Sequence, residues 1–225
     1  GTSIESSRRA FELAEQYKNL YAIVGIHPHH ADKLDEGWDK EIEKIAKSSN
    51  KVVAIGEIGL DYFSYASNGI VEPTTQKKVF IKQIEIANRL KLPLKIHNRQ
   101  AGPDILEILN SQLSIVNCQP PGMLHCFSGN LNFLKSALQM GFYVGFDGNI
   151  TYGGIAKGED TPLSELVENT PIEKIVTETD APFLTPEPHR GSRNEPSYVI
   201  IVAEAIAKIK GLSQTEVEAA TTKHA

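Results

Sequence analysis

Cysteine is scarce in this chain, which excludes a fold held together by disulfide bonds. Only two cysteines, Cys118 and Cys126, occur among the 225 residues. Disulfide-stabilised domains carry several spaced pairs and belong to oxidising compartments. We therefore expect a protein of a reducing compartment, and the predicted location is the cytoplasm.

Long apolar runs and an excess of basic residues are also missing. No stretch is long enough to cross a bilayer and none has the pattern of a signal peptide, so we expect no membrane partner. The 23 lysine and arginine residues are outnumbered by 28 aspartate and glutamate residues, which gives a formal net charge of −5. This balance excludes a protein that coats nucleic acid non-specifically through a global positive field. Any phosphate-binding site must be local.

Apolar, strand-like runs alternate along the chain with segments of helical period. The six runs are YAIVGIH, VVAIGEIGL, LPLKIH, GMLHCF, FYVGFDG and KIVTETD, which begin at residues 21, 52, 92, 122, 142 and 174. This alternation predicts repeated βα units around a parallel sheet, an α/β fold. The length and the 40% hydrophobic content suit one large core, so we predict a single domain over residues 1–225.

The six runs leave two topologies open. An open, doubly wound sheet can be built from six strands, whereas a closed (β/α)8 barrel of the TIM type needs eight. A helical segment at residues 11–17 precedes the first visible run. The barrel alternative therefore requires opening strands that precede Gly1.

Residues that can bind a metal stand where four of the runs turn polar. Glu57 ends VVAIGE, His97 ends LPLKIH, His125 follows GML, and Asp180 ends KIVTETD. The carboxyl ends of parallel strands meet at one rim, so these side chains can converge. Each one alone is more often a core or capping residue. Together they predict a divalent cation, which would offset the cost of removing the two carboxylates from water.

The segments GIHPHHA, GEIGLDY, IHNR, HCFSG and ETDAPFLTPEPHRGSRNEP follow one another along the chain. In this order they resemble the motifs of the TatD family of metal-dependent deoxyribonucleases, within the amidohydrolase-like barrels. The resemblance runs from about Leu20 to the end of the chain. It implies a (β/α)8 TIM-type barrel of the metal-dependent hydrolase kind, with the first strands outside the given chain and the carboxyl end trimmed. It also implies hydrolysis of DNA phosphodiester bonds by metal-activated water, typically as an exonuclease.

The resemblance assigns roles to the four metal-capable residues. Glu57 corresponds to a carboxylate that bridges two metals or holds one, and His97 and His125 correspond to imidazole ligands. Asp180 corresponds to the metal-bound carboxylate that also acts as the catalytic base. Many members carry a His-x-His pair on the first strand, which is absent here. One or two divalent ions are therefore expected, with zinc, magnesium and manganese as the alternatives.

Substrate phosphates need donors beyond the metal. Arg99 and Arg190 lie in loops after candidate ligand strands, and guanidinium matches phosphate with a planar fork of donors. His27 and His29 sit just past the end of the first predicted strand on the same rim, where either can contact phosphate or support a ligand. We predict these four as substrate-binding residues, with DNA or an oligonucleotide as substrate and no obligatory protein partner.

Neighbouring polar residues have structural interpretations, and the same ligand set allows other functions. Asp61 is interpreted as a brace for the loop after Glu57, and Cys126 as a packing residue that strand alternation points away from His125. An amidohydrolase or lactonase acting on a small carbonyl substrate fits the same ligands. A non-enzymatic barrel that has lost activity is a further alternative. The arginines favour a phosphate substrate over a carbonyl substrate. The presence of all four candidate ligands argues against a loss of activity.

Overall fold

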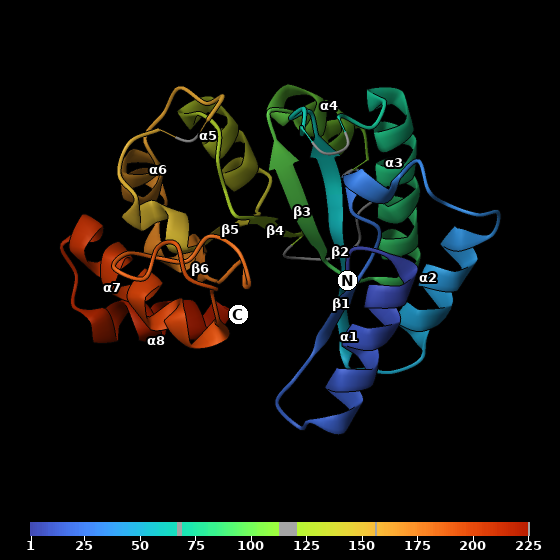
Figure 1. The fold of residues 1–225 in the computed structure, drawn as a ribbon, viewed down its shortest axis with the longest axis horizontal. Helices are drawn as coiled ribbons and strands as arrows, with labels where there is room; N and C mark the ends of the chain where they lie inside the picture. Colours follow the sequence, from blue (N-terminus) through green and yellow to red (C-terminus); the bar gives the residue numbers. More distant parts are fainter. Residues whose placement is uncertain (67–68, 113–120, 156, 225) are drawn as a thin grey trace. The chain divides into compact units, whose positions relative to one another are not determined.

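The structure is a computed structural model that describes residues 1–66, 69–112, 121–155 and 157–224 (Figure 1). Cys118 lies outside these residues. The chain divides into two compact units, Gly1–Met123 and Leu124–Ala225, called here the first and the second unit. Each is described by itself, and the predicted single domain stays a prediction. None of the described helices is long and apolar enough to span a membrane.

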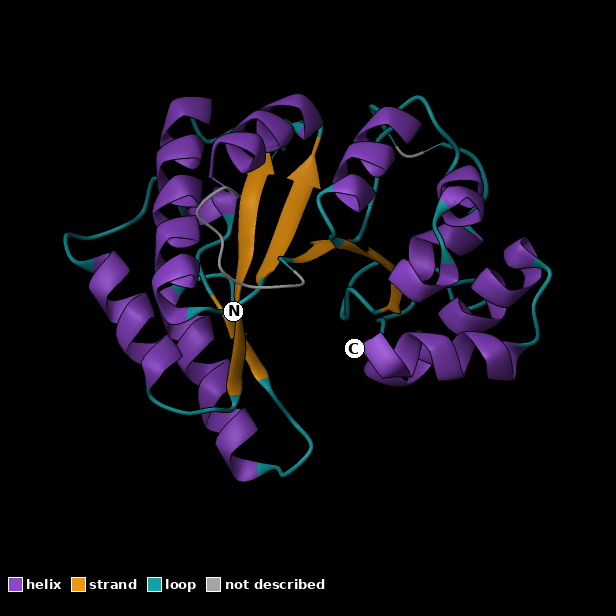
Figure 2. Ribbon diagram, turned by 180° about the vertical axis from the view of Figure 1, so that it is seen from behind, coloured by secondary structure: helices purple, strands orange, loops and turns teal. Residues whose placement is uncertain are grey.

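The first unit alternates helices and parallel strands. Its elements are α1 (Ile4–Gln16), β1 (Ala22–Val24), the 3-10 helix η1 (Pro28–His30), α2 (Trp38–Lys47), β2 (Val52–Asp61), α3 (Pro73–Leu90), β3 (Leu94–Arg99) and α4 (Gly102–Gln112). Strand β2 pairs in parallel with β1 on one side and with β3 on the other. Helices α1, α2 and α3 pack along these strands, as the ribbon coloured by secondary structure shows (Figure 2).

Helix α3 shows how the sequence specifies these elements. Glu72 caps its start by accepting a hydrogen bond from the backbone of Thr74, and Pro73 takes the first helical position, where no backbone donor is needed. Phe80 and Ile84 lie four residues apart on one face and are completely buried. That face covers β2 and helps form the core beneath the strand ends.

The second unit repeats the pattern with shorter strands. Its elements are α5 (Leu131–Gln139), β5 (Tyr143–Phe146), η2 (Gly148–Thr151), α6 (Leu163–Asn169), η3 (Ile172–Lys174), β6 (Ile175–Thr177), η4 (Pro196–Tyr198), α7 (Val199–Lys210) and α8 (Gln214–His224). Strands β5 and β6 are parallel. Helices α7 and α8 pack against each other and against β6. Four phenylalanines of the described residues, Phe127, Phe133, Phe142 and Phe146, are buried in its core.

Strand β4 (Gly122–His125) crosses the division between the units. At its start, the Leu94 backbone N–H of β3 donates to the Pro121 carbonyl (2.9 Å). Just past its end, the Phe127 N–H donates to the Gly145 carbonyl of β5 (2.9 Å). The strands therefore follow one another in sequence order, without the reversal that marks a doubly wound sheet. The expected fold class, an α/β fold of the TIM-barrel type, is confirmed.

Candidate metal centre

Strand β2 presents two carboxylates on one face. Glu57 and Asp61 are four residues apart, so the period-two alternation of a strand directs both side chains to the same side. The expectation that Glu57 ends its strand is wrong, because β2 continues to Asp61. Pairing with β3 changes register between Ile55 and Ile58, an irregularity that bends a strand without ending it. Glu57 lies within this interval.

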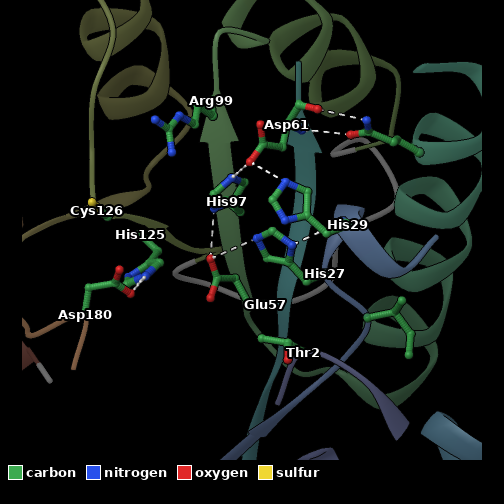
Figure 3. Close-up of polar contacts among 12 residues, drawn as sticks. Thr2, His27, His29, Glu57, Asp61, His97, Arg99, His125, Cys126 and Asp180 are labelled. Atoms are coloured by element: carbon green, nitrogen blue, oxygen red, sulfur yellow. Dashed lines mark hydrogen bonds and ion pairs between the residues drawn. The ribbon is translucent and has the colours of Figure 1, made fainter. Parts of the chain in front are cut away.

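His97 lies between these two carboxylates. Its position on β3 pairs with Gly59 of β2. The Nδ1 atom of His97 is 2.9 Å from Glu57 Oε1, and its Nε2 atom is 3.1 Å from Asp61 Oδ2 (Figure 3). One imidazole therefore bridges both acidic groups of β2.

Two further imidazoles come from the segment after β1. His27 caps η1 by accepting a hydrogen bond at Nδ1 from the His29 backbone (3.2 Å), and Pro28 sets the turn between them. His27 Nε2 then lies 3.8 Å from Glu57 Oε1, and His29 Nε2 lies 3.0 Å from Asp61 Oδ2. Despite that distance, the buried His29 nitrogen makes no hydrogen bond of good geometry. A buried polar atom left in this way is costly, and a cation would satisfy it.

The geometry fits a divalent ion. One ligand atom from each of His27, Asp61 and His97 lies within 4.8 Å of the others. Ligand atoms bound at roughly 2.1 Å to one zinc ion are at most about 4 Å apart, so small side-chain rotations would complete the set. The sequence interpretation of Asp61 as a brace for the loop accounts for only one of its two carboxylate oxygens. Its Oδ1 does accept from the Phe63 backbone (3.0 Å), while its Oδ2 faces the imidazoles.

Burial and charge prepare these groups for metal binding. Burial lowers the pKa of His27 to about 3, and burial also lowers the pKa of His29. Burial alone would lower the pKa of His97, but its hydrogen bonds to Asp61 and Glu57 raise the pKa above its usual value. His27 and His29 are therefore neutral near pH 7, the state in which a ring nitrogen binds a metal.

A network behind Asp61 holds its carboxylate in place. The Tyr65 hydroxyl donates to Asp61 Oδ2 (2.9 Å), and the buried Gln76 bonds to both the backbone N–H and the carbonyl of Asp61. Arg99, at the end of β3, donates to the Tyr65 hydroxyl (2.9 Å) and stacks over the Phe63 ring at 4.2 Å. The predicted substrate-binding arginine is thus fixed beside this candidate centre.

The second unit brings together the other two predicted ligands. His125 ends β4, and its Nε2 lies 3.4 Å from Asp180 Oδ1. Asp180 does not end its strand as expected, because β6 stops at Thr177 and a turn carries the carboxylate beyond it. Glu178, which the sequence analysis missed, lies 2.6 Å from His125 Nδ1 and also accepts from the Cys126 backbone (2.6 Å). Its place two residues before Asp180 in the ETD motif is the signal that could have found it.

Cys126 has polar contacts in addition to its packing. Its backbone is left-handed, with φ +46, so strand alternation no longer sets the direction of its side chain. Its sulfur accepts from Asn149 Nδ2 (3.4 Å). The neighbouring Asp147 is fully buried, and burial raises the pKa of its carboxyl group to about 6, with the charge of Glu178 adding to the effect.

Arg190 lies in the long loop after Asp180. Its guanidinium group is 4.0 Å from the centre of the Tyr152 ring, and its Nη1 is 4.0 Å from Glu187 Oε1. The side chain remains 55% exposed, so its donors are accessible to an anionic ligand. The predicted residues therefore form two groups in the structure: Glu57, His97, His27, His29 and Arg99 in the first unit, and His125, Asp180 and Arg190 in the second.

Comparison with protein families gives a match over the whole chain. The family described as TatD related DNase matches residues 1–225. The chain is 40% identical over 220 residues to the uncharacterized metal-dependent hydrolase YabD of Bacillus subtilis, covering 96% of this chain and 80% of the relative. It is 33% identical over 216 residues to the 3'-5' ssDNA/RNA exonuclease TatD of Salmonella typhimurium, covering 94% and 78%.

Solved structures share the fold. The TatD homolog YJJV from Escherichia coli K12 superimposes with a TM-score of 0.87 at 26% identity, covering 99% of this chain and 82% of that one. The TatD family hydrolase from Entamoeba histolytica gives a TM-score of 0.81 at 25% identity, covering 98% and 80%. Both support the barrel-type architecture inferred from the strand order.

Proposed function

The chain belongs to the TatD-related DNase family of metal-dependent hydrolases, and from this premise we propose that it cleaves phosphodiester bonds of DNA. Exonucleolytic action is part of the proposal, because a relative 33% identical to this chain is named a 3'-5' ssDNA/RNA exonuclease. The proposed partner is a DNA strand or oligonucleotide. The proposal includes no obligatory protein partner.

One observation carries the proposal, namely the His97 imidazole held between Glu57 and Asp61. Carboxylate oxygens combined with imidazole nitrogens are a typical ligand set of hydrolytic metal centres. His27 and His29 extend the set, and the pKa of each is lowered, which leaves the rings neutral and able to bind.

The proposed ligands of one or two divalent ions are Glu57 and His97 in the first unit and His125 and Asp180 in the second. Asp61 is added to this set on the basis of its geometry. Zinc, magnesium and manganese are the candidate metals. Bound at such ligands, a divalent ion lowers the pKa of water and offsets charge on the phosphate oxygens.

The protein's own groups supply the remaining chemistry. Asp180 is proposed as the general base, since its carboxylate is 34% exposed and can accept a proton from water. Glu178 holds His125 through Nδ1, which leaves Nε2, 3.4 Å from Asp180 Oδ1, as the nitrogen that would bind an ion beside that carboxylate. Arg99 and Arg190 are proposed to bind the phosphate oxygens through their forked donors. This pair of arginines favours a phosphate substrate over the carbonyl substrate of an amidohydrolase or lactonase.

Metal content and turnover test the proposal together. Protein freed of metal with a chelator is loaded separately with zinc, manganese or magnesium and assayed on labelled single-stranded DNA and on ester and lactone panels. The Asp180→Asn variant is expected to lose about 10²- to 10⁴-fold in kcat on DNA, the usual contribution of a positioned base. Asp35→Asn, at an exposed residue before α2, is the control. Turnover of lactones without turnover of DNA would contradict the proposal, as would an unchanged Asp180→Asn enzyme.

A further inference from the structure

An exposed aromatic ring stands three residues after Asp180. Phe183 is 68% exposed, the largest exposed fraction among the large hydrophobic residues of the described part of the chain. Single apolar side chains are common on protein surfaces, so exposure alone decides nothing. A binding role requires in addition that the structure hold the Phe183 ring in its exposed position.

Hydrogen bonds fix the backbone on both sides of the Phe183 ring. The Phe183 N–H donates to the Asp180 carbonyl (2.7 Å), and the Phe183 carbonyl accepts from Asn194 Nδ2 (2.6 Å). Asn194 also donates its backbone N–H to the Pro182 carbonyl (3.1 Å) and is only 2% exposed. A buried asparagine thus clamps the short segment that carries the ring.

The residues after Phe183 are equally constrained. Thr185 is 5% exposed, its carbonyl accepts from the Tyr152 hydroxyl (2.8 Å), and its own hydroxyl donates to the Ser192 carbonyl (2.7 Å). A Cβ at Gly148 would lie 2.2 Å from the Leu184 carbonyl oxygen, so the backbone there is already in close contact. These contacts oppose an inward shift that would bury the ring. Because the ring is already held in place, it would lose little conformational entropy when a ligand binds to it.

Arg190, proposed above to bind phosphate, lies in the same loop. Arg190 rests on the Tyr152 ring at 4.0 Å, and Tyr152 is the residue that holds Thr185. Proteins that bind single-stranded nucleic acid combine cationic side chains for the backbone with aromatic rings on which unpaired bases stack. In a duplex both faces of a base are already stacked, so a ring of this kind suits an unpaired strand.

We propose that Phe183 is a nucleobase-stacking subsite that selects single-stranded substrate. The inference rests on the proposed function and deepens it by naming a residue of this chain that contacts a base of the unpaired strand. Arg190 contacts the backbone of the strand whose base lies on Phe183. Because every base has a π-face, the subsite confers no preference for sequence.

Kinetics on matched strands test the subsite. KM and kcat are measured for a single-stranded oligonucleotide and for the same strand with abasic residues, using wild type, Phe183→Leu and Phe183→Tyr. Phe183→Leu is expected to raise KM about tenfold on the strand that carries bases, in line with alanine-scan values for base stacking, and less than about twofold on the abasic strand. The kcat at saturation is expected to stay unchanged. Phe183→Tyr, which keeps a ring, is expected to match wild type.

A binding measurement separates the subsite from the catalytic proposal. A strand with phosphorothioate linkages, which resist hydrolysis, carries 2-aminopurine, whose fluorescence falls when the base stacks. Wild type is expected to quench the fluorescence and Phe183→Leu to leave it bright. Tyr21→Leu, which removes a 63% exposed ring at the opposite end of β1 from His27, is the matched control and is expected to quench like wild type.

Each combination of results has a definite meaning. Quenching that depends on Phe183 without any cleavage of DNA supports the subsite and overturns the nuclease. Cleavage with equal KM and equal quenching in wild type and Phe183→Leu overturns the subsite and leaves the nuclease standing. If the protein neither quenches the fluorescence nor cleaves DNA, both the subsite and the nuclease are overturned.

Discussion

Gly59 lies directly opposite His97 in the parallel pair of β2 and β3, and a Cβ at position 59 would be 2.0 Å from the His97 carbonyl oxygen. The φ angle of Gly59 is +139, which also favours glycine. The place of the imidazole between Glu57 and Asp61 therefore depends on the absence of a side chain at this position.

Gly59→Ala is expected to destabilise the protein by at least about 2 kcal/mol, since overpacking and backbone strain each cost about 1–3 kcal/mol. Urea denaturation measures the loss. Gly37→Ala is the control, because Gly37 also has a positive φ (+86) but no atom within 4 Å of the added Cβ. Equal losses in the two variants would show that contact with His97 contributes nothing.

Asp61→Asn is expected to weaken metal binding at least about tenfold. The loss of a group that only hydrogen-bonds to a metal ligand already weakens binding by about that factor. The amide can still accept the hydrogen bond from the Phe63 backbone, so the loop should keep its shape. Equilibrium dialysis followed by elemental analysis measures the affinity. His30→Asn serves for comparison, since His30 lies in the same HPHH stretch but outside the group of ligand atoms. Full metal affinity in Asp61→Asn would remove Asp61 from the ligand set.

Arg99→Lys is expected to raise KM for DNA about tenfold while changing kcat little. Lysine keeps the charge, but it lacks the planar fork that matches phosphate and the flat surface that stacks on Phe63. Steady-state kinetics separate the two constants. Arg193→Lys is the control at an exposed position in the loop after β6. A KM that does not change would mean that Arg99 makes no contact with substrate.

Asp147→Asn is expected to stabilise the metal-free protein above pH 6 and not at pH 4. The folded pKa of Asp147 is raised from 3.8 to about 6, so the wild type loses stability as the pH rises from about 4 to about 6. The asparagine variant cannot ionise and escapes this loss, which is at most about 3 kcal/mol for two pKa units. Thermal melts of both proteins across this range, in the presence of a chelator, measure the difference.

Asp104→Asn is expected to change the stability of the protein in the opposite direction from Asp147→Asn, and it serves as the comparison. The hydrogen bonds from Lys77 and Tyr62 lower the pKa of Asp104, so its stabilisation is present at neutral pH and is lost as the pH falls below the usual value near 3.8. The variant is expected to be less stable than wild type at pH 7 and to approach it in acid. Identical pH dependence in the two variants would contradict both assignments.

The sequence predicted the positions of the strands well because the apolar pattern of a strand lies in consecutive residues. Each of the six apolar runs overlaps a strand of the structure, since parallel strands are buried on both faces and need continuous apolar residues. Helix α6 (Leu163–Asn169) went unpredicted, because seven residues are too few to show a helical period. Tyr17, the last residue of the helical segment predicted at residues 11–17, lies beyond the end of α1 and is 56% exposed.

The candidate site was harder to predict than the fold. Glu57, His97, His125 and Asp180 stand out as polar residues near strand ends, and the structure brings them together in pairs. Asp61 was missed as a ligand because β2 was expected to end at Glu57, whereas the strand continues to Asp61 and presents both carboxylates on one face. The clamp of Glu178 on His125 depends on a contact across 53 positions of the chain, for which local patterns carry no information.

The boundary between Met123 and Leu124 falls inside β4, a strand that hydrogen-bonds at its beginning within one unit and just past its end within the other. The two halves are therefore not modules that recombination could exchange as finished pieces. A hybrid of two relatives spliced at that boundary would have to match two parental sequences along a single strand. A junction in the turn after α5 would leave every strand with one parent.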